Sequence, residues 1–212
     1  MPIVPESHGS TWASPKPRTS RANAERAIIA AVNELLDTTP IPDITVHKIA
    51  EVAGVNFGYI NRYFETRLNL FVLVTDALAD TAVIQLRETL NNEIPNTQRP
   101  SKEVPTKLLD QVRVSNVAIA RKRLRLIQYL LASGVPVERF GAKSRETLDL
   151  AIQMGSELGF DVELARAAAI RFIALTWIEA SLAPSLGITS EELNHAFTLG
   201  AAEPKLASRS KK

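Results

Sequence analysis

Apolar residues recur three or four positions apart along most of the chain, which is the period of an amphipathic α-helix. In the N-terminal part this period predicts helices at about 20–36, 45–53, 57–64 and 66–90. Further along it predicts helices at about 104–120, 122–133, 138–158, 161–183 and 189–201. No segment shows the strict alternation of apolar and polar residues that is typical of a strand. The pattern therefore predicts an all-α fold.

Two of these helices are short and lie close together, at residues 45–64. Thr45 and Asn56 are good N-caps for them, because their side-chain oxygens can accept hydrogen bonds from free backbone N–H groups. Gly54 lies between the helices, where a residue that tolerates the left-handed region ends a helix at little cost. Helix, turn and helix at this spacing predict a helix-turn-helix unit, whose second helix can enter the major groove of DNA.

The outward residues of the second short helix suit nucleic acid. Asn61 can make paired hydrogen bonds to adenine, and Arg62 can do the same to guanine. Gly58 removes bulk near the helix start, where free N–H groups and the helix dipole favour a phosphate. The alternative is a helix pair that binds another protein and no nucleic acid.

The same residues carry a family resemblance. The run Thr45…Ile49-Ala50…Ala53-Gly54-Val55-Asn56…Gly58…Tyr63-Phe64, followed by Arg67 and Leu70, resembles the tetracycline-repressor (TetR) family over about residues 22–82. The resemblance implies that DNA is contacted by Thr45, His47, Lys48, Phe57, Gly58, Tyr59, Asn61, Arg62, Tyr63 and Arg67, with Arg67 on a phosphate. Phe57, Asn61 and Leu68 depart from the family pattern, and the first two put the operator sequence in doubt.

Composition and motifs favour a binding protein rather than an enzyme. The 212 residues include no Cys, which excludes disulfides and thiolate zinc sites. The three His residues show no metal-ligand spacing, and no common catalytic or phosphate-binding motif occurs. We therefore expect no catalytic residues, no metal and no cofactor.

The start of the chain lacks the basic and apolar pattern of a secretory signal. The apolar region 164–183 is interrupted by Arg166, Arg171 and Glu179, which argues against a membrane span. The sequence therefore predicts a soluble, cytoplasmic protein.

Charge is unevenly distributed, although the net charge is only +2. Residues 1–98 carry 8 basic and 11 acidic side chains, whereas residues 99–125 carry 8 basic and 2 acidic ones. Within the second segment, Arg121, Lys122, Arg123 and Arg125 lie at a predicted helix junction, where they could attract an anion or form a solvated face.

Both ends of the chain are predicted to be unstructured. The Pro-containing arm 1–19 ends in a basic segment, 16–21, which could enter a minor groove or remain a solvated tail. Residues 202–212 form a basic, flexible tail.

The helices between the two ends predict two domains: a DNA-binding head at 20–82 and a ligand-binding and dimerisation domain at 83–201. Helix 161–183 is apolar on two sides, which predicts a homodimer through this helix and the one at 189–201. The alternative is a central helix in a monomer.

An apolar cavity in the second domain could be lined by aromatic and flexible side chains, namely Tyr129, Phe140, Met154, Phe172 and Trp177. These residues could equally form a packed core. The family resemblance implies an inducer pocket here, and hence a repressor that a small apolar molecule releases from a palindromic operator. The alternative is a ligand-independent DNA-binding regulator or architectural protein with a filled core.

Overall fold

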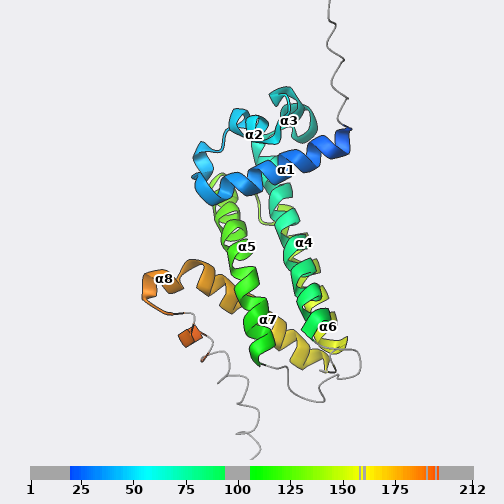
Figure 1. Ribbon diagram of the computed structural model, residues 1–212, viewed down its shortest axis with the longest axis vertical. Coiled ribbons are helices and arrows are strands. Elements are labelled where there is room, and N and C mark those ends of the chain that lie inside the picture. Colours follow the sequence, from blue (N-terminus) through cyan, green and yellow to red (C-terminus); the bar gives the residue numbers. More distant parts are fainter. Residues whose placement is uncertain are drawn as a thin grey trace, which may run out of the picture.

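A computed structural model describes residues 20–93, 106–157, 159, 161–189, 191–193 and 195. The predicted arm 1–19, the tail 202–212 and most of the predicted helix 189–201 lie outside these residues. The described chain is helical throughout and holds no strand, which confirms the all-α prediction (Figure 1). Its helices are α1 (Arg21–Thr38), η1 (Ile41–Asp43), α2 (Val46–Ala53), α3 (Phe57–Phe64), α4 (Arg67–Glu93), α5 (Thr106–Ala132), α6 (Glu138–Glu157), α7 (Val162–Ser181) and α8 (Ala183–Leu186).

The N-terminal helices form a head at one end of the molecule, where α1, α2 and α3 lie across the ends of α4 and α5 (Figure 1). The bounds of α1, α2 and α3 agree with the predicted helices to within two residues. The short 3-10 helix η1 lies in the segment before α2, which the sequence predicts as a loop. There Pro40 and Pro42 flank Ile41, whose buried side chain anchors the segment to the core.

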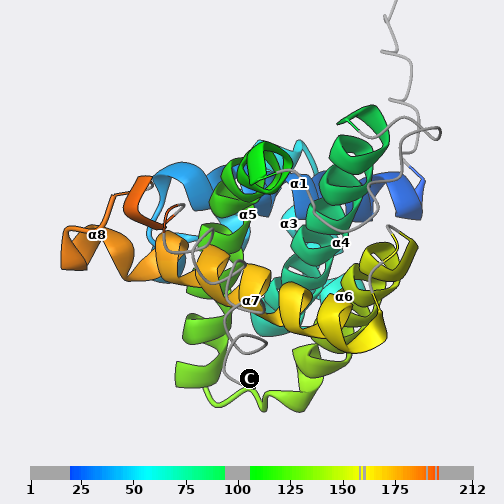
Figure 2. The same cartoon turned by 90° about the horizontal axis from the view of Figure 1, so that it is seen from below.

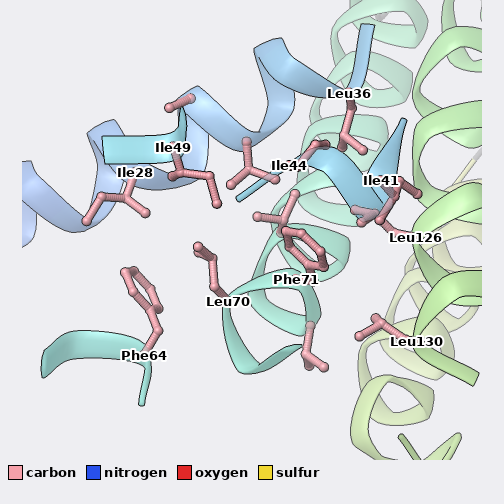
Figure 3. Packing of buried hydrophobic residues seen from close by; sticks show 14 of the residues in the cluster. Ile28, Leu36, Ile41, Ile44, Ile49, Phe64, Leu70, Phe71, Leu126 and Leu130 are labelled. Atoms are coloured by element: carbon pink, nitrogen blue, oxygen red, sulfur yellow. The ribbon is translucent and has the colours of Figure 1, made fainter. Parts of the chain in front are cut away.

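The core of the head continues into the rest of the protein. Ile28 of α1, Ile49 of α2 and Phe71 of α4 belong to one cluster with Leu126 and Leu130 of α5 (Figure 3). Most side chains of this cluster are almost completely removed from solvent. Phe64, Ile41 and a few others at its edge are slightly more exposed. The head is therefore stabilised in part by α5, and α4 is shared by the head and by the helices that follow it.

Below the head, α4 and α5 run side by side, and α6 and α7 pack on them and on each other (Figures 1 and 2). Figure 2 shows α7 running across the view from α8 towards α6. A buried ion pair between Arg113 of α5 and Glu179 of α7 joins two of its helices. The prediction of two helices at 104–120 and 122–133 is wrong, because α5 is continuous through this region.

One stretch of α4, Arg67–Thr89, is long and apolar enough to cross a membrane by length and composition alone, the only such helix in the described parts of the chain. In the structure Leu70, Phe71, Val74 and Leu78 on this stretch are buried in the core cluster. Packing within the protein therefore accounts for much of its apolar character.

Helix α7 keeps part of its apolar surface exposed. Its buried side consists of small and polar residues such as Ala165, Ala169 and Thr176, whereas Leu164 is 45% exposed and Leu182, which follows the helix, is 55% exposed. After α8, Thr189 and Glu192 form a capping box, in which Glu192 accepts hydrogen bonds from the backbone N–H and the hydroxyl of Thr189. These hydrogen bonds lower the pKa of Glu192.

Candidate nucleic-acid interface and inner cavity

Caps and a glycine fix the turn between α2 and α3. The Oγ1 of Thr45 accepts from the backbone N–H of Lys48 at 3.3 Å, and the Oδ1 of Asn56 accepts from that of Gly58 at 2.8 Å. Gly54 ends α2 with φ 64°, the left-handed conformation that a side chain disfavours. A Cβ on Gly58 would lie 3.1 Å from the Oδ1 of Asn56, so a larger residue would crowd the cap of α3. The sequence signals for this turn therefore act as predicted.

The predicted recognition face of α3 lies at the surface of the head. Phe57 is 49% exposed and Tyr59 is 40% exposed, although both are large aromatic residues. Gly58, Asn61 and Arg62 are also exposed, whereas Tyr63 is half-buried. On α2 and its N-cap, the exposed residues are Thr45, His47 and Lys48. Ile60 and Phe64, on the opposite side of α3, are buried in the core.

Aromatic contacts order this surface. The rings of His47 and Phe57 stack with centroids 5.1 Å apart, which connects α2 to the start of α3. Tyr59 and Tyr63 stack at 5.5 Å, one turn apart on α3. The guanidinium of Arg21 lies 5.2 Å from the centre of the Tyr63 ring, at the distance of a cation–π contact. The result is a continuous surface from α1 to α3 that carries aromatic and cationic groups.

Arg21, the last residue of the basic segment 16–21, is the first residue of α1, as the predicted helix at about 20–36 implies. Its Nε donates to the carboxylate of Glu25 at 2.7 Å, and this bond raises the pKa of Arg21. The two residues are four apart, the spacing at which side chains are neighbours on one face of a helix.

The chain turns sharply between α3 and α4. Glu65 has φ 62° and ψ −53°, and the backbone N–H of Thr66 donates to the carbonyl of Phe64 at 2.6 Å. This is a three-residue γ-turn of the rarer, strained kind. The turn sets the direction of α3 relative to α4.

The structure does not support the predicted phosphate contact of Arg67. Its guanidinium points into the protein, where Nη1 donates to the carbonyls of Pro42 at 3.1 Å and Ile44 at 3.0 Å. Nη2 donates to the hydroxyl of Tyr129 at 2.6 Å. The Arg67 guanidinium also lies over the rings of Phe71 and Tyr129. Arg67 therefore joins the segment before α2 to α5, which a sequence pattern could not show.

A cavity of about 400 Å³ lies among α4, α5, α6 and α7. Met154, Phe172 and Trp177 line it, as predicted. Tyr129 and Phe140 do not line it: both pack with the core cluster that joins the head to α5 and α6, which is the packed-core alternative for these residues. Apolar spacing predicted that these side chains are buried, but not which helices they face.

The cavity wall carries polar side chains that the prediction missed, among them Arg123 and Ser144. Arg123 is buried; its Nε donates to the carbonyl of Thr75 at 3.2 Å and its Nη2 to the Oγ of Ser144 at 2.9 Å. Burial lowers the pKa of Arg123, and the nearby charge of Asp76 partly opposes this shift. A sequence signal was present, because Arg123 lies three residues after Ala120 and four before Ile127, on the buried side of α5.

The cations of the basic run in α5 make hydrogen bonds to other helices, although Arg121 is exposed. Lys122 donates to the carbonyl of Asn33 and to the carboxylate of Asp37, and Arg125 donates to the carbonyl of Leu36. These groups lie at the C-terminal end of α1, where unpaired carbonyls favour cations. Arg121 donates to the carbonyl of Ala180. These hydrogen bonds therefore connect α5 to the head and to α7.

In the described parts of the chain, no three His, Asp or Glu side chains are grouped closely enough to hold a metal ion. The features that remain as candidate sites are the outer face of α3 with α2, and the cavity.

Comparison with known proteins gives a match in structure only. No family model matches the sequence, and no curated protein matches it. Among solved structures, a Mesorhizobium loti protein assigned to the TetR family of transcriptional regulators has a TM-score of 0.60 at 19% identity, over 90% of this chain and 98% of that one. The TetR-family repressor AlkX from Dietzia has a TM-score of 0.55 at 17% identity, over 89% and 98% of the two chains.

A third structure is FadR from Thermus thermophilus, a TetR-family transcriptional repressor in complex with lauroyl-CoA. It has a TM-score of 0.52 at 18% identity, and the similarity covers 84% of this chain and 93% of that one. These similarities span both the head and the helices that enclose the cavity. The chain therefore has the fold of the TetR-family transcriptional regulators.

Proposed function

We propose that this protein is a DNA-binding transcription regulator that reads a palindromic operator as a homodimer. The observation that carries the proposal is the outer face of α3, where Phe57, Tyr59, Asn61 and Arg62 are exposed together on the head. Exposed aromatic residues that are grouped on one surface indicate a binding site, whereas single exposed apolar residues do not. Entry of α3 into a major groove would use this group.

Each exposed side chain has a role that its chemistry suits. Asn61 and Arg62 read base edges, since both can form paired hydrogen bonds there. Phe57 contacts a thymine methyl group, which is the apolar feature of the groove. The stacked tyrosines and the exposed Lys48 contact phosphates. Thr45 and His47 approach the backbone from the start of α2, and Arg67 is excluded from the set by its inward hydrogen bonds.

Dimerisation involves the exposed apolar side of α7, together with the segment 189–201, most of which lies outside the described residues. Leu164 and Leu182 are half exposed at its two ends, and Ala168 is exposed between them. A second copy that covers this row would remove it from water and place two recognition helices on one duplex. Small residues in the middle of the row allow two helices to approach closely.

We further propose that the protein acts as a repressor in the cytoplasm and that a small molecule in the cavity releases it from DNA. The head at 20–82 and the ligand-binding and dimerisation domain at 83–201 are the two functional units. The cavity favours this reading over a ligand-independent regulator with a filled core. The similar repressor FadR is described in complex with lauroyl-CoA, which supports the proposal that a protein of this fold binds a small molecule. A ligand acts here only through different affinities for two arrangements of the heads.

Selection of bound fragments from a pool of random duplexes tests the proposal. We expect recovery of a sequence with twofold symmetry, bound by the full-length chain with an affinity that falls steeply with salt concentration. Recovery of no enriched sequence at low ionic strength would contradict the assignment as a sequence-specific regulator.

A further inference from the structure

The cavity among α4 to α7 is mostly apolar, yet a buried cation forms part of its wall. Ala79, Val83 and Leu86 of α4, Leu148 of α6 and Phe172 of α7 supply apolar surface. Its volume of about 400 Å³ lies within the range of about 300–1,000 Å³ that is usual for small-molecule sites. Ile170 and Ala174 line the cavity and are exposed, so it opens to the surface beside α7.

Arg123 is the cation in this wall, and its hydrogen bonds leave donors unused. The two acceptors, the carbonyl of Thr75 and the hydroxyl of Ser144, are neutral oxygens. They occupy Nε and one N–H of Nη2, out of the five N–H donors of a guanidinium. Nη1 makes no hydrogen bond to any residue that the structure describes. A buried cation with unused donors favours an anionic partner.

Asp76 influences this cation from α4 but does not accept one of its hydrogen bonds. Burial raises the pKa of Asp76, while the charges of Arg123 and Lys143 oppose the rise. The Oδ1 of Asp76 is buried without a hydrogen-bond partner among the described residues. The site therefore holds a carboxyl group that makes no hydrogen bond to the guanidinium of Arg123, whose unused donors can bind a second carboxylate.

We propose that the cavity binds a compact monoanionic amphiphile, an apolar chain or ring system with one carboxylate, whose carboxylate is held by Arg123 and Ser144. The apolar part lies against α4, α6 and α7, next to Trp177. This inference rests on the proposed ligand-regulated function and names the chemical class of its ligand. An uncharged hydrocarbon would fill the cavity but leave the donors of Arg123 unused.

A head-group series on the full-length protein tests the proposal. Decanoate, decanol and decylamine share one chain and differ in charge, and each is titrated below the concentration at which it aggregates. Binding is followed by calorimetry and by the fluorescence of Trp177, which lines the cavity. We expect decanoate to bind about 10- to 100-fold more tightly than decanol, because a charge-assisted hydrogen bond is gained. Decylamine is expected to bind weakest.

Two variants locate the carboxylate. Arg123→Gln should abolish the preference for decanoate over decanol, whereas Arg121→Gln, two residues away and outside the cavity wall, should retain it. Ser144→Ala removes only a hydroxyl and should reduce the preference part of the way. If Arg123→Gln does not fold, Ser144→Ala and the wild-type series still decide the question.

Failure of this inference is distinct from failure of the proposed function. Equal or tighter binding of decanol, or no binding of decanoate, overturns the carboxylate assignment. A preference that survives in Arg123→Gln also overturns it. DNA binding is measured on the same preparation: a protein that selects an operator but prefers decanol remains a regulator with a different ligand. If the protein binds decanoate through Arg123 but binds no DNA duplex, the ligand class is correct and the proposed regulator function is wrong.

Discussion

Arg67 of α4 donates a hydrogen bond of 2.6 Å to the hydroxyl of Tyr129 of α5, 62 residues further along the chain. The same guanidinium donates to the carbonyls of Pro42 and Ile44, which precede the first helix of the helix-turn-helix. One side chain thus connects the entrance of α2, the start of α4 and the helix that carries Arg123. A change of the cavity that moves α5 would reach the head through this contact.

Tyr129→Phe tests that connection. Removal of the hydroxyl leaves a half-buried guanidinium with one acceptor fewer, and we expect the free energy of unfolding to fall by about 1–3 kcal/mol. Chemical denaturation measures this loss. Operator affinity of the folded variant should stay within about twofold of the wild type, since Tyr129 does not lie on the recognition face.

Tyr59→Phe is the matched control, because it removes the same hydroxyl from an exposed ring on α3. It should leave stability nearly unchanged and weaken DNA binding. If instead Tyr59→Phe lowers the stability and Tyr129→Phe does not, the contact between Arg67 and Tyr129 does not stabilise the head.

Lys122 and Asp37 provide a second test of the attachment between α5 and α1, where the Nζ–Oδ2 distance is 2.7 Å. Asp37 is largely exposed, so we expect a coupling energy of only about 0.2–1 kcal/mol in a double-mutant cycle. Lys122→Ala should cost more than Asp37→Ala, because Lys122 also donates to the carbonyl and side chain of Asn33. Equal costs of the two single substitutions would mean that the bonds to Asn33 contribute nothing.

The short helices of the head could be predicted from the sequence because local chemistry determines their ends. Thr45 and Asn56 accept hydrogen bonds from the first turns of α2 and α3, and Gly54 adopts the left-handed conformation between them. These effects act within a few residues. The exposure of the α3 face also follows from spacing, since Ile60 and Phe64 define the buried side.

The errors concern contacts between helices that are distant in sequence. The basic run near Arg121 resembled a break in α5, but carbonyls of α1 and α7 accept hydrogen bonds from this run, and the helix continues. The sequence leaves Tyr129 open between the cavity wall and the core, and the structure shows that its hydroxyl accepts a hydrogen bond from Arg67. Such a pairing depends on how helices pack, which apolar spacing alone does not specify.

The pH dependence of stability should report on Asp76. Because burial raises its pKa, the native state holds the proton more tightly than the unfolded state. Stability therefore falls as the pH rises from the ordinary range of an aspartate through the raised pKa of Asp76. Asp76→Asn should lose this component, so that unfolding free energies of the two proteins converge or cross with rising pH. If the difference in unfolding free energy between the two proteins does not change over this pH range, the pKa of Asp76 is not raised as described.

Leu182→Arg tests the dimer surface. Leu182 and Ile84 are both 55% exposed, but only Leu182 lies on the proposed interface of α7. An arginine buried there without a partner should shift the protein towards monomer and weaken operator binding by at least about tenfold. Sedimentation measures the oligomeric state. Ile84→Arg on α4 should remain dimeric, and a dimer that tolerates Leu182→Arg would exclude this end of α7 from the interface.

The central claim is that the exposed face of α3 reads base sequence, and Arg62 tests it most directly. Once an operator has been selected, the affinities of wild type and of Arg62→Ala are compared on that operator and on all its single-base variants. We predict a loss of about 1–3 kcal/mol, with relaxed discrimination at one position of each half-site. Arg87→Ala removes the same charge from an exposed site on α4 and should leave affinity and specificity unchanged. Uniform weakening on every sequence would make Arg62 a phosphate contact, and no change at all would contradict the assignment of this face as the DNA reader.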